Sequence, residues 1–310
     1  MLISRLVFGC ARLAGGASES ASRRLVEQAL AGGITHFDTA PSYGLGTAEQ
    51  VVGRTVGSDP NILVTAKIGS VRPKHPLALT ALRRARRLLP RRQADVPYIP
   101  VFPGDRHEPD GCFDLPFMEQ SIEVTLANLR RQSVDYLLLH EGYSAPSDAV
   151  VSFLDGLVTD GLAGCVGFAN SAVYDPALRA ACPDHWAAQA AIEPGMLLGP
   201  AAAAPPVLLH SLVKTDGWLR ARDGRYAAAA DRAVSRMAEL GDRDAIAALL
   251  PYCLAAQNAP AAKLIYATTD AARLAAVLAV AHAIEAGPTV EAIADTFAEA
   301  YAAAGGSAEG

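Results

Sequence analysis

The chain has 310 residues, of which 51% are hydrophobic and 19% are charged, and its net charge at pH 7 is −5. These proportions exclude a disordered chain, because they supply ample apolar material for a core. The acidic balance argues against a globally basic nucleic-acid-binding protein.

The distribution of charges, prolines and cysteines predicts a cytoplasmic protein. The longest uncharged stretch, 194–213, contains four prolines and two glycines, so we predict no membrane-spanning helix there. Arg5 and Arg12 interrupt the N-terminal segment, which lacks the apolar run of a signal peptide. The five cysteines are odd in number and form no C-x-x-C pair, so we expect reduced thiols.

Short β-rich runs alternate along the chain with helical patterns. The clearest helix, over 117–131, places Ile122, Leu126 and Leu129 on one face. The apolar run that follows it predicts a strand buried on both faces. The predicted strands are 6–9, 34–38, 62–67, 134–140, 164–168, 186–192, 207–212 and 264–267, and the main predicted helices are 20–30, 47–56, 117–131, 149–158, 245–256 and 271–284.

This alternation predicts an α/β protein with a parallel sheet. Eight strands in about 300 residues fit a closed (β/α)8 TIM barrel better than an open sheet. We expect a single domain over 1–302, followed by a flexible tail over 303–310 that is rich in alanine, glycine and serine.

A long insertion, about 71–115, interrupts the rhythm. It carries six arginines between positions 83 and 92. They could form a patch for an anionic partner, but the interpretation we favour is a solvated helix above the barrel. The same insertion contains His107, Glu108, Asp110 and Cys112, whose spacing matches no standard zinc site, so we predict no metal there. This segment and 194–232 are the loops expected to shape the substrate pocket.

Polar residues end three of the predicted strands. They are Asp38, Lys67 and His140, and Tyr43 follows Asp38 by five residues. Active residues of a (β/α)8 barrel lie at the carboxyl ends of its strands. Taken singly, each residue has an ordinary structural interpretation, such as a turn aspartate, a rim tyrosine or a hydrogen-bonded core histidine. Together, at matching strand ends, they favour a catalytic site.

The chemistry of these side chains suits proton transfer to a carbonyl. A buried Lys67 needs an anion, and Asp38 is the natural partner. A cation beside Tyr43 favours the phenolate, which suits a tyrosine acting as general acid. His140 could orient the same oxygen through a hydrogen bond. None of these groups accepts electrons, so redox chemistry would require a cofactor.

Several motifs resemble the aldo-keto reductase family over essentially the whole chain, from position 6 to about 284. They are the signature-like segments 33–44 and 48–53, the lysine strand 65–67 and the histidine strand 135–140. The resemblance implies NAD(P)H-dependent reduction of a small aldehyde or ketone, or the reverse alcohol oxidation, without a metal. It implies that Tyr43 is the general acid, that Lys67 and Asp38 tune it, and that His140 positions the substrate.

The resemblance also implies a set of cofactor-binding residues. Asn170 and Gln189 would hold the nicotinamide carboxamide, although Ala169 replaces the family's usual serine. His210 falls where the family usually has a tyrosine that stacks on the nicotinamide. The complete set is Asn170, Gln189, His210, Ser211, Thr268 and Arg273.

The adenosine end of the nucleotide is less clearly specified. Arg273 is in register with the family's arginine and favours NADP(H). Ala267 stands where a lysine is common, and Asp270 adds a negative charge nearby, so NAD(H) is retained as an alternative.

Two other functions stay open at this stage. One is a non-catalytic barrel that binds a nicotinamide nucleotide and acts as a regulatory or assembly subunit; the altered Ala169, His210 and Ala267 are compatible with it. The other is an enzyme that uses a tightly held nucleotide for internal redox on a sugar-like substrate. We expect no nucleic-acid or membrane partner, and a monomer or simple homo-oligomer. The particular substrate does not follow from the sequence.

Overall fold

The computed structural model describes residues 1–13, 18–73, 112–140, 145–169, 174–199 and 207–305. Several predicted features lie outside these ranges: the six arginines of the insertion, three members of the His107–Cys112 cluster, and Asn170. The insertion and the single-domain boundary therefore stay predictions. Helix α12 extends to Gly305, three residues into the segment 303–310 that we expect to be a flexible tail.

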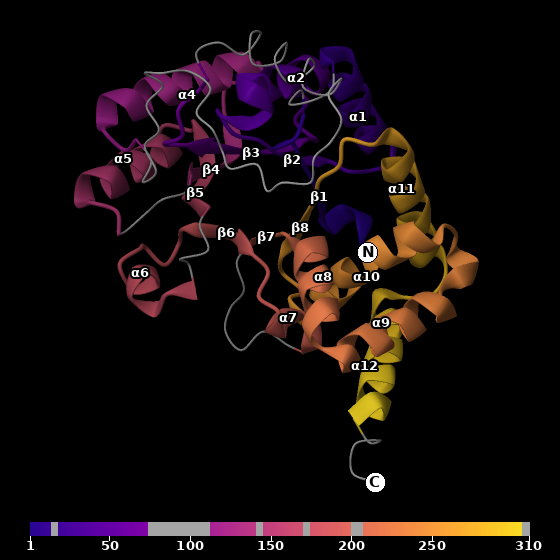
Figure 1. The fold of residues 1–310 in the computed structure, drawn as a ribbon. Helices are drawn as coiled ribbons and strands as arrows, with labels where there is room; N and C mark the ends of the chain where they lie inside the picture. The colour runs from indigo at the N-terminus through magenta and orange to yellow at the C-terminus, as the bar shows by residue number, and fades with distance from the viewer. Residues whose placement is uncertain (14–17, 74–111, 141–144, 170–173, 200–206, 306–310) are drawn as a thin grey trace, which may run out of the picture. The chain divides into compact units, whose positions relative to one another are not determined.

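Eight parallel strands form a closed barrel in sequence order, which confirms the predicted (β/α)8 architecture (Figure 1). The strands are β1 (Leu6–Gly9), β2 (His36–Asp38), β3 (Leu63–Ile68), β4 (Val134–His140), β5 (Ala163–Ala169), β6 (Ala187–Ala191), β7 (Leu208–His210) and β8 (Lys263–Tyr266). Each one falls within or overlaps a predicted strand. Bounds differ by a few residues, because strand ends pass into turns that keep an apolar composition.

The helical elements alternate with these strands along the chain. They are η1 (Ile3–Arg5), α1 (Glu19–Ala31), η2 (Tyr43–Gly46), α2 (Ala48–Thr55), α4 (Leu115–Leu129), α5 (Asp148–Thr159), α6 (Pro176–Ala180), α7 (Gly195–Leu198), α8 (Leu212–Arg222), α9 (Gly224–Arg236), η4 (Ala238–Leu240), α10 (Arg243–Asn258), α11 (Ala271–Ala286) and α12 (Val290–Gly305).

The segment 194–232 is more regular than the sequence analysis predicts, which expects a pocket-shaping loop that contains only the strand 207–212. It contains α7, β7, α8 and most of α9. The buried face of α9 consists largely of alanines together with Tyr226 and Val234. Alanine is a strong helix former, but it gives a weak contrast between apolar and polar faces. The periodicity that would reveal this helix is therefore faint.

By its internal contacts, the chain divides into two compact units. The first comprises 1–7, 28–35 and 189–310, and the second comprises 8–27 and 36–188. The second unit contains β2 to β5, with Asp38 opposite Thr65 and Lys67 opposite Leu138 in the parallel register. His140 lies opposite Ala169 at the end of β4. This register brings the polar strand ends of three adjacent strands to one edge.

Glycine allows helices α2 and α4 of this unit to lie side by side (Figure 1). A Cβ atom on Gly53 would lie 2.1 Å from the carbonyl oxygen of Asn128 in α4. No side chain fits at that separation, so the close approach requires glycine. This explains one residue of the segment 48–53.

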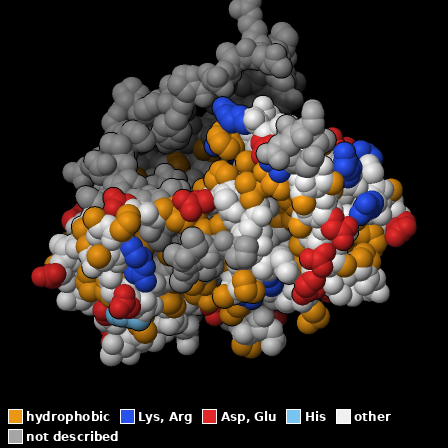
Figure 2. Space-filling view, turned by 90° about the horizontal axis from the view of Figure 1, so that it is seen from below, with side chains coloured by type: hydrophobic (Ala, Val, Ile, Leu, Met, Phe, Trp, Pro, Cys, Tyr) orange, Lys and Arg blue, Asp and Glu red, His pale blue; other side chains and the backbone are white. Residues whose placement is uncertain are grey.

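The first unit contains β7 and β8, the end of β6 and helices α8 to α12. Arg5 fastens the end of α10 through hydrogen bonds to the carbonyl oxygens of Ala256, Ala259 and Ala262. Within the described ranges, no single helix is long and apolar enough to cross a membrane. Helices α11 and α12 together have the length and apolar composition of a span, but the pair is bent by 96°. Acidic, basic and apolar side chains are interspersed on the described part of the face in Figure 2.

Candidate active site

Lys67 and Asp38 form a buried ion pair at the carboxyl ends of β3 and β2. Lys67 lies near the end of β3 and Asp38 is the last residue of β2. The Lys67 Nζ donates to Asp38 Oδ1, and the two side chains are 0% and 3% exposed. The contact is the one expected from the sequence, because a buried ammonium requires a counter-ion.

The surroundings of Lys67 act on its charge in opposite directions. Burial lowers the pKa of Lys67, while the charge of Asp38 and its hydrogen bond act to raise it. The thiol of Cys10 is also close in electrostatic terms, and burial together with Asp38 raises the pKa of that thiol well above its ordinary value. Cys10 is therefore a neutral neighbour of the pair.

Tyr43 lies in η2, directly after the turn that follows β2. Its half-buried ring meets the ring of His140 edge-on, with centroids 5.5 Å apart and planes at 80°. The next three residues, Gly44, Leu45 and Gly46, all have positive φ, at 58°, 60° and 83°. The positive φ costs free energy at Leu45, because a residue with a side chain disfavours the left-handed region of backbone conformation. Strain of this kind is typical of functional loops.

The backbone leaves the Tyr43 turn little freedom. A Cβ atom on Gly44 would lie 2.2 Å from the carbonyl oxygen of Leu13. The Tyr43 N–H donates to the Ala40 carbonyl at 3.1 Å. The structure thus brings Asp38 to Lys67 and Tyr43 to His140 within one compact unit, on adjacent strands and the loop after β2.

The described residues of the predicted cofactor set belong to the other unit. Gln189 in β6 is 4% exposed, and its Oε1 accepts no hydrogen bond from the described residues. A buried amide oxygen without a donor is costly, so the position fits a ligand that brings an N–H, as a carboxamide does. His210 Nδ1 lies 2.8 Å from Ser211 Oγ. Ser211 has a φ of 64°, so a member of the predicted set itself has a strained backbone.

The loop after β8 places Asp270 at the start of α11. Its carboxylate accepts from the backbone N–H groups of Ala272 and Arg273 at 2.9 and 3.1 Å. The Asp270 N–H donates to Thr268 Oγ1 at 3.1 Å. Arg273 is exposed in the first turn of the helix. The carboxylate occupies the helix N-terminus, where a phosphate would otherwise be favoured, and so opposes the attraction of Arg273.

The sequence analysis does not identify two pairs of polar residues that lie near the site. His36 and Thr65 lie two residues before Asp38 and Lys67, and strand alternation alone places them on the same face. Arg72 pairs with Glu49, which lies inside the signature-like segment 48–53. No sequence signal marks Arg72, because its partner is distant in the chain. Among the residues the structure describes, no group of three or more histidines, cysteines or carboxylates could hold a metal.

The model of the aldo/keto reductase family matches residues 5–181, which include Asp38, Tyr43, Lys67 and His140. The chain belongs to the aldo/keto reductase family. An uncharacterized oxidoreductase of Mycobacterium tuberculosis is 43% identical over 54 residues. That alignment spans 17% of this chain and 17% of the relative, so it says little about the whole protein.

Solved structures share the fold along most of the chain. An aldo-keto reductase from Klebsiella pneumoniae, in complex with NADPH, has a TM-score of 0.62 at 18% identity and covers 94% of this chain and 89% of its own. A glycerol dehydrogenase from Gluconobacter oxydans has a TM-score of 0.58 at 19% identity, and the match covers 96% of this chain and 92% of the dehydrogenase. At these identities the similarity shows the barrel fold alone.

Proposed function

We propose that this protein is an NAD(P)H-dependent oxidoreductase that reduces a small aldehyde or ketone to an alcohol, or runs the reverse reaction. The observation that carries the proposal is the buried Lys67–Asp38 pair on β3 and β2, with β3 lying next to the strand that ends in His140. Tyr43 meets that histidine edge-on. This combination supplies an acid, a charge that stabilises its conjugate base, and a polar group to orient a substrate oxygen.

In reduction, Tyr43 gives its phenolic proton to the carbonyl oxygen. The Lys67 ammonium stabilises the phenolate that results, which lowers the barrier to proton release. Burial lowers the pKa of Lys67, and Asp38 opposes that effect and so favours the charged amine. His140 directs the substrate oxygen toward the phenol. In the reverse direction, the Tyr43 phenolate takes the proton of the alcohol.

A bound nicotinamide would supply the hydride that none of these side chains can provide. Gln189 fits it best, because its buried Oε1 lacks a donor among the described residues. We assign the carboxamide to Gln189 and Asn170, the nicotinamide ring to His210, and the adenosine ribose with its 2′-phosphate to Thr268 and Arg273, in the manner of the family. Ser211 completes the predicted nucleotide-binding set.

We favour NADP(H) because Arg273 can pair with a 2′-phosphate. The carboxylate of Asp270 beside it acts in the opposite sense, so NAD(H) is the alternative. The Klebsiella pneumoniae relative, which was solved with NADPH, supports a nicotinamide nucleotide of either kind. The remaining parts of the proposal are a cytoplasmic location, a monomer or homo-oligomer, and no metal.

The second candidate is a non-catalytic barrel that binds a nucleotide and serves another protein. Ala169 and His210 favour it, because they replace the serine and tyrosine that the family resemblance leads one to expect.

Titration of the purified protein with NADPH and with NADH, followed by intrinsic fluorescence, tests both candidates. The enzyme proposal expects saturable binding of at least one nucleotide and oxidation of the reduced form with some member of a panel of small aldehydes and ketones. Binding without turnover over the whole panel, in either direction, would favour the non-catalytic barrel. A nucleotide that copurifies and does not exchange would indicate internal redox.

A further inference from the structure

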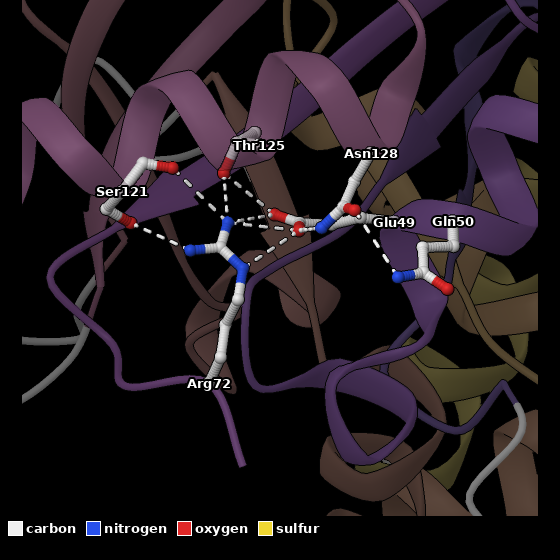
Figure 3. Close-up of polar contacts among 6 residues, drawn as sticks. All are labelled: Glu49, Gln50, Arg72, Ser121, Thr125 and Asn128. Atoms are coloured by element: carbon white, nitrogen blue, oxygen red, sulfur yellow. Dashed lines mark hydrogen bonds and ion pairs between the residues drawn. The ribbon is translucent and has the colours of Figure 1, made fainter. Parts of the chain in front are cut away.

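Glu49 is a buried carboxylate with a full set of donors. It lies in α2, and the residue is 1% exposed. The guanidinium of Arg72 donates through Nη2 to Oε1 and Oε2 at 3.1 and 3.0 Å. The Thr125 hydroxyl donates to Oε1 and the Asn128 amide to Oε2, both at 2.9 Å (Figure 3). The charge is therefore neutralised and hydrogen-bonded on both oxygens.

Arg72 is held as firmly as its partner. Its Nη1 donates to the Ser121 hydroxyl and its Nη2 to the Ser121 carbonyl, both at 3.3 Å (Figure 3). Helix α4 therefore grips both members of the pair. An ion pair of this kind, with Glu49 buried and the Arg72 side chain 22% exposed, adds little net stability compared with apolar residues of the same shape. The place of the pair in the chain indicates a role other than stabilisation.

Each member of the pair follows a catalytic segment. Glu49 is the second residue of α2, which begins directly after the Tyr43 turn. The Thr47 hydroxyl donates to the Gly44 carbonyl at 2.8 Å and so joins the start of α2 to that turn. Arg72 follows Lys67 by five residues, after a left-handed turn at Gly69 with a φ of 94°.

Both segments leave their strands through glycine-containing turns of positive φ. Such turns do not by themselves hold a neighbouring side chain to a fraction of an ångström. The Glu49–Arg72 pair joins the two segments, because one partner belongs to the Tyr43 segment and the other to the Lys67 segment. The pair thus ties together the two pieces of chain whose side chains must meet for proton transfer.

We propose that Glu49 and Arg72 are positioning residues that hold the Tyr43 phenol in register with the Lys67 ammonium. The proposal rests on the proposed function. It assigns no contact with substrate or nucleotide to either residue. A small displacement of an acid from its substrate is expected to lower turnover by roughly 10- to 100-fold. Nucleotide binding does not involve this pair and should stay unchanged.

The test uses the full-length protein and conservative variants. Arg72→Lys keeps the charge opposite Glu49 but loses the planar fork that engages both carboxylate oxygens. Glu49→Gln keeps the shape and removes the charge. We expect kcat to fall about 10- to 100-fold in both variants, with KM for the carbonyl and Kd for the nucleotide within about twofold of the parent values.

Arg131→Lys is the matched control. Arg131 also fastens chain segments of this unit, through the carbonyl oxygens of Gly57, Asp59 and Ile62, but it joins neither catalytic segment. We expect this variant to lose thermal stability and keep its kcat. If Arg72→Lys does not fold, Glu49→Gln and Thr125→Val carry the comparison, because both leave the arginine in place.

A cycle with Tyr43→Phe separates positioning from a merely structural role. If the pair acts through the phenol, Arg72→Lys should lower the residual turnover of Tyr43→Phe by less than about twofold. A parent-like kcat in Arg72→Lys and Glu49→Gln, an equal loss in Arg131→Lys, or a full additional loss in the Tyr43→Phe background would each overturn the inference. Full activity in Tyr43→Phe alone would instead overturn the proposed function.

Discussion

The imidazole of His36 lies 2.8 Å from the hydroxyl of Thr65, along the same diagonal that joins Asp38 to Lys67 one layer further along the strands. In the register of β2 and β3, His36 is opposite Leu63 and Asp38 is opposite Thr65, so each bond reaches two residues ahead on β3. His36 also stacks on Tyr136, with ring centroids 5.7 Å apart. The ion pair therefore sits on a second polar layer and not on an apolar core.

Thr65→Val should destabilise the protein with little effect on turnover. The substitution leaves the Nε2 of a buried histidine without this hydrogen-bond partner, which is expected to cost about 1–3 kcal/mol in the free energy of unfolding. Urea unfolding measures the loss. Thr55→Val is the control, because that hydroxyl donates to a carbonyl of its own helix at a half-buried position. Equal losses in the two variants would mean that the His36–Thr65 hydrogen bond contributes no more to stability than the hydrogen bond of Thr55 within its own helix.

Asp38→Asn should make stability depend on pH through Lys67. Burial lowers the pKa of Lys67 and Asp38 opposes that effect, so the variant releases the lysine proton more readily when folded. Between this lowered pKa and the unfolded value of about 10.4, the folded state binds fewer protons than the unfolded state. The free energy of unfolding therefore rises with pH across that window.

At neutral pH we expect Asp38→Asn to lose about 3–5 kcal/mol, because the ammonium is buried without its counter-ion. The difference in free energy of unfolding between the variant and the parent should become smaller toward the upper end of the window, where the variant's lysine is neutral in both the folded and the unfolded state. Urea unfolding at a series of pH values measures it. The double variant Asp38→Asn with Lys67→Met should show no such narrowing. A deficit that is the same at every pH in the single variant would contradict the argument.

Tyr43→Phe should keep nucleotide binding and lose most carbonyl reduction. The ring still fills its place against His140, but the proton donor is absent, so turnover should fall on the order of 10²–10⁴-fold. Fluorescence titration and steady-state kinetics separate the two effects. Tyr301→Phe, which removes a hydroxyl bonded to Asp223 in the other unit, serves as the control. Turnover in Tyr43→Phe equal to that of the control would remove Tyr43 from the mechanism.

The barrel strands could be predicted from the sequence because each is a short apolar run bounded by turn residues. The Lys67–Asp38 pair could also be predicted, since a lysine and an aspartate at the ends of neighbouring buried strands have few other partners. Helices α8 and α9 could not, because their buried faces use alanine and polar residues such as Asp216. The Glu49–Arg72 pair could not, because it depends on the tertiary approach of α2 to the segment that follows β3.

We expect the choice of nucleotide to depend on the charge balance at the start of α11. Arg273→Ala should weaken NADPH binding by about 1–3 kcal/mol and affect NADH much less, if the arginine meets the 2′-phosphate. Asp270→Asn is the complementary change. Asparagine keeps the helix cap, which aspartate now provides to Ala272 and Arg273, but it removes the negative charge.

We expect Asp270→Asn to tighten NADPH binding relative to NADH, because the helix N-terminus and Arg273 are then free of a competing anion. Fluorescence titration of both variants and the parent with both nucleotides measures the ratio of Kd values. Salt should reduce the difference, since the charges involved are exposed. If both substitutions change the two Kd values equally, this loop does not read the 2′-phosphate. The preference for NADP(H) would then lose its only residue-level support, and NAD(H) would be the cofactor to use in the substrate screen.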